Sequence, residues 1–339
     1  MNFKIDENSI GQRLDKFLAD NLSTPSSVGA NFSRSQIQKK IKSGEVLVND
    51  KLVTPHYFLK EGDVVLVSSV KESSVKDNEL FKNIEIISKT ENYLVINKPA
   101  GLLVHPVKST TGRGILPEAK LFDRVNPTEN NNEQTLADWL VKKFPKIKSV
   151  WDHDNPDGKI RPGIVHRLDR DVCGLMVLAR TQAMLNNLKE QFQARTVQKE
   201  YTALAHGNIE LDEGEITRSI TRSKKTGLMI ARGTNSEQGK NAVTKFEVLK
   251  RYKNYTLLKV KLITGRTHQI RVHLRSIGHS VVGDTLYQTK DVRKAKNKPE
   301  LDFIFLCSTL LSFQDLNNEQ QEFEIELPVY LVDFLKTIK

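Results

Sequence analysis

The segment RPGIVHRLDRDVCGLMVLAR, residues 161–180, holds the densest group of residues that could carry chemistry. A short charged stretch lies between two apolar, strand-like runs, so a loop at a sheet edge would present charged groups on a rigid support. Asp169 stands between Arg167 and Arg170, and neighbouring cations keep a carboxylate ionised. An ionised carboxylate suits a nucleophile better than a proton donor. The alternative is a structural ion pair, which is common in loops rich in Asp and Arg.

Two later segments carry further candidates. In QKEYTA, residues 198–203, Tyr201 is either a core aromatic or a residue that stacks on a base or transfers a proton. TGRTHQIRVHLRSIG, residues 264–278, predicts a helix over 267–276 with His268, Arg271 and Arg275 on one polar stripe. Arg266 would lie at its start, where free backbone N–H groups also attract anions. The alternative is an ordinary basic surface helix.

The sequence argues against metal and nucleotide cofactors. It contains no phosphate-binding loop of the ATPase type, no glycine-rich dinucleotide motif and no nucleophile elbow. His268 and His273 are five residues apart, a spacing unsuited to two metal ligands on one helix. His153 lies among acidic residues, but no second histidine follows at ligand spacing. We therefore expect neither a metal site nor a bound cofactor.

The elements that must position these residues read as a mixture of strands and fewer helices. Strand-like runs cover 84–87, 93–98 and 256–263, and helical spacing of apolar residues covers 135–144 and 183–194. Because there is no regular alternation of strand and helix, we expect an α+β domain with a mixed or antiparallel sheet. Residues 107–133 read as a surface insertion, and they and residues 218–235 are the loops we expect to contact a ligand.

The first 70 residues read as a small separate α/β module. Apolar spacing predicts helices near 11–22 and 36–44, and Asn49-Asp50 marks a hairpin turn. Arg34, Lys39 and Lys40 lie in or just before the second helix, as either an ordinary polar face or a surface that contacts phosphates. We assign 1–70 to this module, 71–83 to a polar linker and 84–339 to the main domain.

Charge gives the first indication of a partner. The 339 residues include 52 Lys and Arg against 41 Asp and Glu, a net charge of +11. Residues 195–275 contain 17 basic and 7 acidic side chains, so most of the excess lies in that quarter of the chain. A localised basic region favours a polyanion such as nucleic acid, although a well-solvated lysine-rich surface is the simpler alternative.

The sequence also indicates where in the cell the protein is located. No apolar run approaches the length of a membrane span or a signal peptide, and Cys173 and Cys307 are too few for a disulfide framework. These features lead us to expect a cytoplasmic protein with no membrane partner.

Two regions resemble known families. Arg13-Leu14-Asp15, the stretch SRSQIQKKIKSGEVLVND and the EGD turn resemble the S-four-type RNA-binding domain. Residues 84–330 resemble the RluA-type family of RNA pseudouridine synthases, nearer its RluD and RluC branches. The resemblance is carried by four ordered motifs: NKPAGLLVHP (97–106), GIVHRLDRDVCGLMVLA (163–179), QKEYTALAHG (198–207) and LITGRTHQIRVHLRSIGHSVVGDTLY (262–287).

The resemblance implies roles for individual residues. Asp169 would be the nucleophile, and Arg167 would enter the RNA stack and help displace the target nucleotide. Tyr201 would stack on the uracil and assist removal of the proton from carbon 5. Arg271 would pair with Asp169 and hold it charged, with Arg266 ranked second for that task. Further substrate contacts would come from His166, Leu168, His268 and Ile270 in the catalytic domain, and from Arg34, Lys39 and Lys40 in the N-terminal module.

One departure from the family pattern stands beside the nucleophile. Val172-Cys173 replaces the usual Thr-Ser before Gly174, which removes two hydroxyls that could support the loop. We still expect activity, because Asp169 is retained. The resemblance implies that a monomer isomerises specific uridines to pseudouridine in structured RNA, with large-subunit ribosomal RNA as the expected substrate. The alternatives are the same reaction on transfer RNA, or a non-catalytic RNA-binding protein of ribosome assembly.

Overall fold

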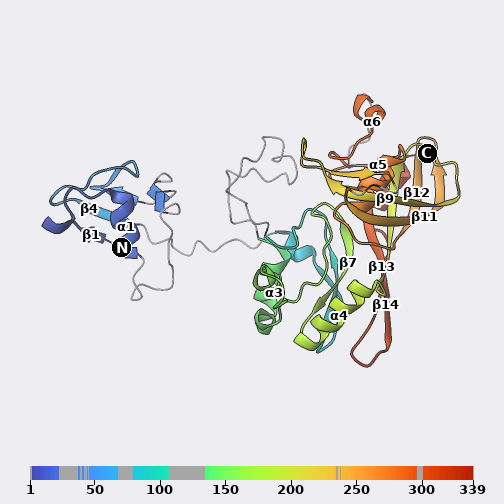
Figure 1. Ribbon diagram of the computed structural model, residues 1–339, viewed down its shortest axis with the longest axis horizontal. Coiled ribbons are helices and arrows are strands. Elements are labelled where there is room, and N and C mark those ends of the chain that lie inside the picture. Colours follow the sequence, from blue (N-terminus) through green and yellow to red (C-terminus); the bar gives the residue numbers. More distant parts are fainter. Residues whose placement is uncertain are drawn as a thin grey trace. The chain divides into compact units, whose positions relative to one another are not determined.

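The protein is described by a computed structural model in which the chain forms two compact units, Met1–Lys76 and Asp77–Lys339 (Figure 1). Each unit has a hydrophobic core of its own. The residues that the structure describes are 2–22, 37–38, 40–41, 44, 46–67, 79–106, 134–233, 236, 238–295 and 301–338.

The described residues of the N-terminal unit form a four-stranded antiparallel sheet and the helix α1 (Leu14–Leu22), and residues 37–38 and 40–41, within the second predicted helix, are also helical. Its strands, in sheet order, are β1 (Asn2–Lys4), β4 (Val64–Val67), β2 (Val46–Val48) and β3 (Lys51–Leu52). The hairpin turn predicted at Asn49 and Asp50 joins β2 to β3, with φ of 52° and 62° at the two residues. Both values lie in the left-handed region that a tight two-residue hairpin requires.

The larger unit is built on one ten-stranded sheet, in the order β10-β9-β11-β12-β8-β13-β7-β6-β5, with β14 beside β13. β13 and β7 pair in parallel, and the other pairings are antiparallel. The strands are β5 (Glu85–Lys89), β6 (Tyr93–Lys98), β7 (Cys173–Ala179), β8 (Gln198–His206), β9 (Glu213–Arg222), β10 (Met229–Arg232), β11 (Lys240–Tyr252), β12 (Tyr255–Leu262), β13 (Leu306–Gln314) and β14 (Gln320–Glu324).

Helices cover different parts of this sheet (Figure 1). α4 packs on β7 and β13, whereas α5 packs on β9, β10 and β11. The middle strand β8 therefore lies where the two covered regions meet. The helices are α3 (Leu136–Lys143), α4 (Gln182–Ala194), α5 (Gln269–Ser276), α6 (Lys290–Lys294) and α7 (Val329–Thr337), with short 3-10 helices η1 (Glu7–Ser9), η2 (Glu79–Asn83), η4 (Pro145–Ser149) and η5 (Gly158–Ile160).

The α+β class with a mixed, mostly antiparallel sheet is confirmed. The helix expected over 135–144 is α3, which starts after a capping box formed by Thr135 and Asp138. The helix expected over 183–194 is α4, whose first turn is capped by Thr181. None of the helices that the structure describes combines the length and the hydrophobicity needed to cross a lipid bilayer.

Three expectations need comment. The end of the predicted linker, Glu79–Asn83, is the helix η2, because Phe81 is apolar and packs into the core of the larger unit. Half of residues 218–235 form strands and not a loop, since they contain the end of β9 and all of β10. The expected insertion at 107–133 lies outside the described residues.

Candidate active site

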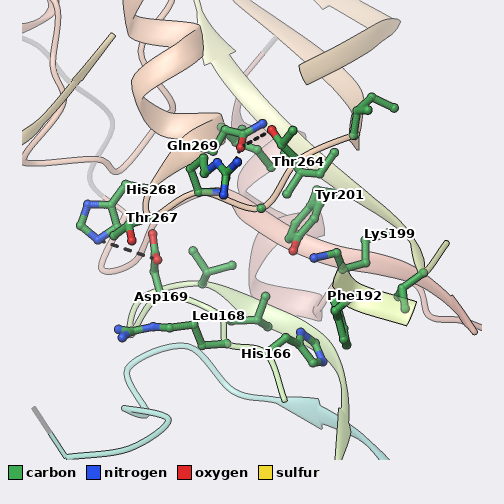
Figure 2. Close-up of a pocket in the computed structure, with 18 of the residues that line it drawn as sticks. His166, Leu168, Asp169, Phe192, Lys199, Tyr201, Thr264, Thr267, His268 and Gln269 are labelled. Atoms are coloured by element: carbon green, nitrogen blue, oxygen red, sulfur yellow. Dashed lines mark hydrogen bonds and ion pairs between the residues drawn. The ribbon is translucent and has the colours of Figure 1, made fainter. Parts of the chain in front are cut away.

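A cavity of about 510 Å³ opens where β8 meets the loop before β7 and the segment that leads from β12 into α5 (Figure 2). These three pieces carry the three motifs that the sequence singled out, and the fold brings them together. The cavity is lined by both apolar and charged side chains: Val165, His166, Arg167, Leu168, Asp169, Val172, Phe192, Gln193, Arg195, Val197, Lys199, Tyr201, Leu262, Ile263, Thr264, Gly265, Arg266, Thr267, His268, Gln269, Ile270, Arg271 and Leu306.

Asp169 and Arg271 form the central ion pair. Nη1 of Arg271 donates to Oδ2 of Asp169 at 2.9 Å. The side chain of Asp169 is 18% exposed and that of Arg271 is 5% exposed. On its other side the guanidinium binds Asp284 through two bonds, of 2.7 Å from Nε and 3.1 Å from Nη2. Asp284 is buried and also accepts the backbone N–H groups of Leu286 and Tyr287. Asp284 thus fixes Arg271, and Arg271 in turn fixes Asp169.

His268 approaches Asp169 from the start of α5. Its Nε2 lies 3.8 Å from Oδ1 of Asp169, and its Nδ1 lies 2.7 Å from the hydroxyl of Tyr287. The residue has φ of 55°, in the left-handed region that non-glycine residues adopt at an energetic cost. This conformation explains why α5 begins at Gln269, two residues later than the sequence predicts. The imidazole is turned toward Asp169 (Figure 2).

The surroundings of Asp169 hold its carboxyl ionised. Burial alone would raise the pKa of Asp169, but the positive charges of His268 and Arg271 and the hydrogen bond from Arg271 lower it below the ordinary value. Burial also lowers the pKa of His268, so at neutral pH the permanent charge beside Asp169 is Arg271. The arrangement provides an anionic oxygen at an open cavity, as nucleophilic attack requires.

Tyr201 lies opposite, on β8, and forms one wall with apolar neighbours. It is 5% exposed, and burial followed by the negative charge of Asp169 raises the pKa of its hydroxyl. Leu168 and Ile270 are both buried and line the same cavity. A flat aromatic face beside aliphatic side chains suits a planar base.

The two residues before Leu168 behave differently. His166 accepts the backbone N–H of Val177 through Nε2 at 3.1 Å and stacks on Phe192, with ring centroids 4.8 Å apart. Burial, followed by the charge of Lys199, lowers the pKa of His166 to about 3, so the ring is neutral. Arg167 is exposed, and its Nη1 lies 3.3 Å from Nε2 of the buried His105. His166 therefore anchors the loop, whereas Arg167 reaches out of it.

The motif around residues 97–106 supports this loop from behind. Lys98 is fully buried, and its Nζ donates to the carbonyl oxygens of Pro99, Leu102 and Arg170 at 2.8, 2.9 and 3.0 Å. Gly101 and Arg170 add a backbone bond of 2.9 Å from the Gly101 N–H to the Arg170 carbonyl. The carbonyl oxygen of Arg170, the residue after Asp169, therefore accepts from both Lys98 and Gly101.

The departure at Val172-Cys173 leaves the loop closed. The N–H of Val172 donates to the carbonyl of Asp169 at 3.2 Å, and the Cys173 thiol lies 3.8 Å from the carbonyl of Leu306. Both side chains are buried. Backbone bonds and packing thus support the loop in the absence of the two hydroxyls.

The remaining sequence candidates are placed less centrally. Arg266 lines the cavity, but its Nε donates to the carbonyl of Asn241 at 3.2 Å; Arg271 makes the pair with Asp169. The N–H of Arg266 is taken by the Gln269 side chain at 2.9 Å, so it is not a free anion donor. Lys40 is half-buried in the N-terminal unit, and Arg34 and Lys39 lie outside the described residues.

Four functional neighbours were missed by the sequence reasoning: Asp284, His105, Gln269 and Lys199. Asp284, His105 and Gln269 lie inside the quoted motifs, but only the folded chain shows that they contact Arg271, Arg167 and Thr264. Lys199 precedes Tyr201 by two residues, and strand periodicity alone could have placed it on the same face. Within the described residues, no three His, Cys, Asp or Glu side chains group closely enough to hold a metal ion.

Comparison with known proteins agrees with this geometry. The family described as RNA pseudouridylate synthase matches residues 92–276, and the S4 domain family matches residues 12–65. An uncharacterized RNA pseudouridine synthase of Bacillus subtilis is 32% identical over 335 residues, which cover 98% of this chain and 96% of that protein. Ribosomal large subunit pseudouridine synthase C of Haemophilus influenzae is 31% identical over 329 residues, covering 93% and 87%.

A solved structure agrees at the level of the fold. Human RNA pseudouridylate synthase domain containing 4 matches with a TM-score of 0.55 and 24% identity, over 77% of this chain and 96% of that one. Taken with the family match, these similarities define the class: the chain belongs to the RNA pseudouridylate synthase family. The protein is an RNA pseudouridine synthase that carries an N-terminal S4 domain.

Proposed function

We propose that this protein converts specific uridines of large-subunit ribosomal RNA to pseudouridine, with Asp169 as the nucleophile. The observation that carries the proposal is the Asp169 carboxylate, held ionised by Arg271 at an open cavity that Tyr201 faces. The substrate is supported by the relative from Haemophilus influenzae, whose name specifies the ribosomal large subunit.

The chemistry needs only groups that line the cavity. A carboxylate oxygen of Asp169 attacks the target nucleotide, at carbon 1′ of the ribose or at carbon 6 of the ring. The bond between nitrogen 1 and carbon 1′ breaks, the base turns, and carbon 5 bonds to carbon 1′. The carbon 5 proton is lost, a proton returns to nitrogen 1, and the carboxylate is released. The reaction is an isomerisation, so no co-substrate enters the balance.

The neighbouring residues divide the remaining tasks. Tyr201 stacks on the uracil. Because its pKa is raised, the hydroxyl is protonated at rest, so it helps to remove the carbon 5 proton as a relay that passes its own proton to water while it accepts that one. Arg167 is exposed at the mouth, where it can fill the space that a flipped nucleotide leaves in the RNA stack. Flipping costs a few kcal/mol, which basic contacts to the backbone offset.

The test compares Asp169→Asn with wild type on unmodified RNA transcripts, with carbodiimide mapping of pseudouridine as the readout. We expect wild type to modify large-subunit RNA and Asp169→Asn to bind that RNA equally well and form no detectable product. Asp154→Asn is the matched control, because Asp154 is 91% exposed and is not among the residues that line the cavity.

Three outcomes would count against parts of the proposal. Product formed by Asp169→Asn would refute the nucleophile. Product confined to transfer RNA would refute the ribosomal substrate and keep the chemistry. Wild-type binding without product on any RNA would favour a binding protein of ribosome assembly.

A further inference from the structure

Five cationic side chains line the cavity, and Lys199 differs from the other four. They are Arg167, Arg195, Lys199, Arg266 and Arg271. Arg271 is neutralised by two carboxylates, Arg167 and Arg195 are exposed, and Arg266 is half-buried with Asn241 O as an acceptor for its Nε. Lys199 is half-buried on β8, and among the described residues its Nζ has no hydrogen bond or ion pair. Nζ makes a cation–π contact with Phe192 and lies 5.1 Å from the centroid of its ring.

Lys199 and Tyr201 extend from the same face of β8, because they are two residues apart on one strand. Figure 2 shows the Lys199 side chain pointing toward the Tyr201 hydroxyl. Gly265 faces the ammonium from the other side of the cavity, and a Cβ there would lie 3.7 Å from Nζ. The missing side chain leaves room beside the ammonium at the place where a base stacked on Tyr201 would lie.

A buried lysine can be purely structural, and Lys98 shows what that looks like in this protein. Three carbonyl oxygens accept from Lys98 Nζ, so the ammonium has a full set of hydrogen-bond partners, although burial still lowers its pKa to about 7. Lys199 has no such acceptors among the described residues. Burial lowers the pKa of Lys199 to about 8, as it lowers that of Lys98, so the missing acceptors and not the pKa distinguish Lys199. A hydrogen-bond acceptor on the ligand would offset the cost of burying this charge.

The ligand that reaches this depth is the base. Phosphates of a bound RNA are bulky and hydrated, and the exposed arginines at the mouth are suited to them. Uracil presents carbonyl oxygens at carbons 2 and 4. When the bond from nitrogen 1 to carbon 1′ breaks, its electron pair stays with the ring, and the resulting negative charge spreads over nitrogen 1 and these oxygens. A cation beside the ring stabilises that charge more than it stabilises neutral uracil.

We propose that Lys199 is a further catalytic residue, which donates a hydrogen bond from Nζ to a carbonyl oxygen of the flipped uracil and stabilises the anionic base. This inference rests on the proposed function and extends it. Lys199 keeps its proton throughout and forms no covalent bond. Because the base becomes anionic whether Asp169 attacks the ribose or the ring, the role of Lys199 holds for both routes.

The experiment measures kcat, KM and their pH dependence on the RNA substrate for wild type, Lys199→Met and Lys199→Arg. Lys199→Met keeps the length of the side chain and removes the charge, so we expect kcat to fall roughly 100- to 1,000-fold with KM within about threefold. Lys199→Arg retains the charge and should keep a larger share of the activity than Lys199→Met. Lys148→Met, an exposed lysine of η4, is the matched control and should behave as wild type.

The pH profile separates this role from a structural one. The charged form of Lys199 is lost as pH rises, so wild-type kcat/KM should fall above about pH 8. The other groups that face Lys199 titrate elsewhere: burial lowers the pKa of His166 to about 3, the pKa values of Asp169 and His268 are also lowered, and that of Tyr201 is raised. The remaining charged groups of the cavity are the guanidinium groups of Arg167, Arg195, Arg266 and Arg271.

We therefore expect the alkaline fall to move to higher pH in Lys199→Arg and to disappear in Lys199→Met. The proposal is overturned if Lys199→Met keeps kcat near the wild-type value, or if the fall near pH 8 persists unchanged in both variants. In either case wild-type product would still support the proposed function, so the two failures are distinguishable. Absence of product from wild type would instead refute the proposed function.

Discussion

Arg271 shows how a single buried cation can hold a carboxylate in place. Its guanidinium has five N–H donors in a rigid fork, and the structure places two of the bonds on Asp284 and one on Asp169. The face of the same guanidinium lies 4.9 Å from the ring centroid of the buried Tyr287. With the guanidinium confined on three sides, Asp169 has one favourable position, and its second oxygen is left for the substrate.

Asp284→Asn should therefore damage both stability and catalysis. The substitution keeps the shape and removes one buried charge, so we expect a loss of about 3–5 kcal/mol in the free energy of unfolding. Rotation of the guanidinium would misplace Asp169 and lower kcat by up to roughly 100-fold. Urea unfolding and single-turnover assays measure the two effects.

Asp212→Asn is the control for this change. Asp212 pairs with Arg251 at 2.7 Å but is 87% exposed, so its loss should alter stability by less than about 1 kcal/mol. Equal losses for the two variants would show that burial of the Arg271 pair contributes nothing.

The sequence predicted which segments carry the site better than it predicted which side chains touch. Asp169, Tyr201 and Arg271 come from three separate motifs, and 102 positions separate Asp169 from Arg271. The structure brings all three to one cavity. The contact of Arg271 with Asp284 was not predictable, because helical spacing orders residues along α5 and says nothing of a turn thirteen residues later. Lys199 was missed for a related reason, since charge on a strand usually indicates a solvated face.

β7 contains a position near the site, Gly174, at which no side chain can be accommodated. It starts directly after the reactive loop and pairs in parallel with β13 through Cys173 and Gly174. Gly174 has φ of 114°, and a Cβ there would lie 2.3 Å from the carbonyl oxygen of Ser308. The close pairing of these strands thus depends on the absence of a side chain. The sequence marked Gly174 as part of a motif but could not show this approach.

Gly174→Ala should separate β7 from β13 at the base of the loop. We expect the left-handed backbone to cost about 1–2 kcal/mol and the clash with β13 to add about 1–3 kcal/mol. Gly278→Ala isolates the first effect, because Gly278 has φ of 93° and no atom within 4 Å of the built Cβ. Thermal unfolding should rank the variants wild type, Gly278→Ala and Gly174→Ala in falling stability. The steric account fails if the two alanine variants unfold together.

Elements were predicted well where one periodicity dominates. The amphipathic α3 and α4 and the alternating β12 matched their patterns closely, because each buries one face against the sheet. α5 was predicted two residues too long at its start, since no propensity signals that His268 is held in the left-handed region by its neighbours. The hairpin of β9 and β10 was missed because its strands carry many polar residues and face solvent on one side.

Across the chain, charge and core are divided unequally between the two units. Residues 1–76 contain 11 basic and 9 acidic side chains, whereas residues 77–339 contain 41 and 32. Each unit has its own core, and every residue that lines the cavity belongs to the larger one. The cavity and most of the excess positive charge therefore belong to residues 77–339, and we expect the S4 domain to add RNA contacts of its own.

Removal of residues 1–76 should accordingly weaken binding and spare the reaction. We expect the affinity for the RNA substrate to fall by at least roughly 10-fold, because one of two linked binding surfaces is lost. At saturating RNA, kcat should stay within about threefold of the full chain, since the cavity is intact. The slope of log affinity against log salt should be largely retained, because it reports phosphate contacts and residues 195–275 carry most of the net charge. Filter binding at several salt concentrations and single-turnover assays measure these quantities.

Loss of turnover at saturating RNA, despite an unchanged unfolding temperature of the remaining unit, would mean that the S4 domain helps assemble the site and does more than hold the RNA.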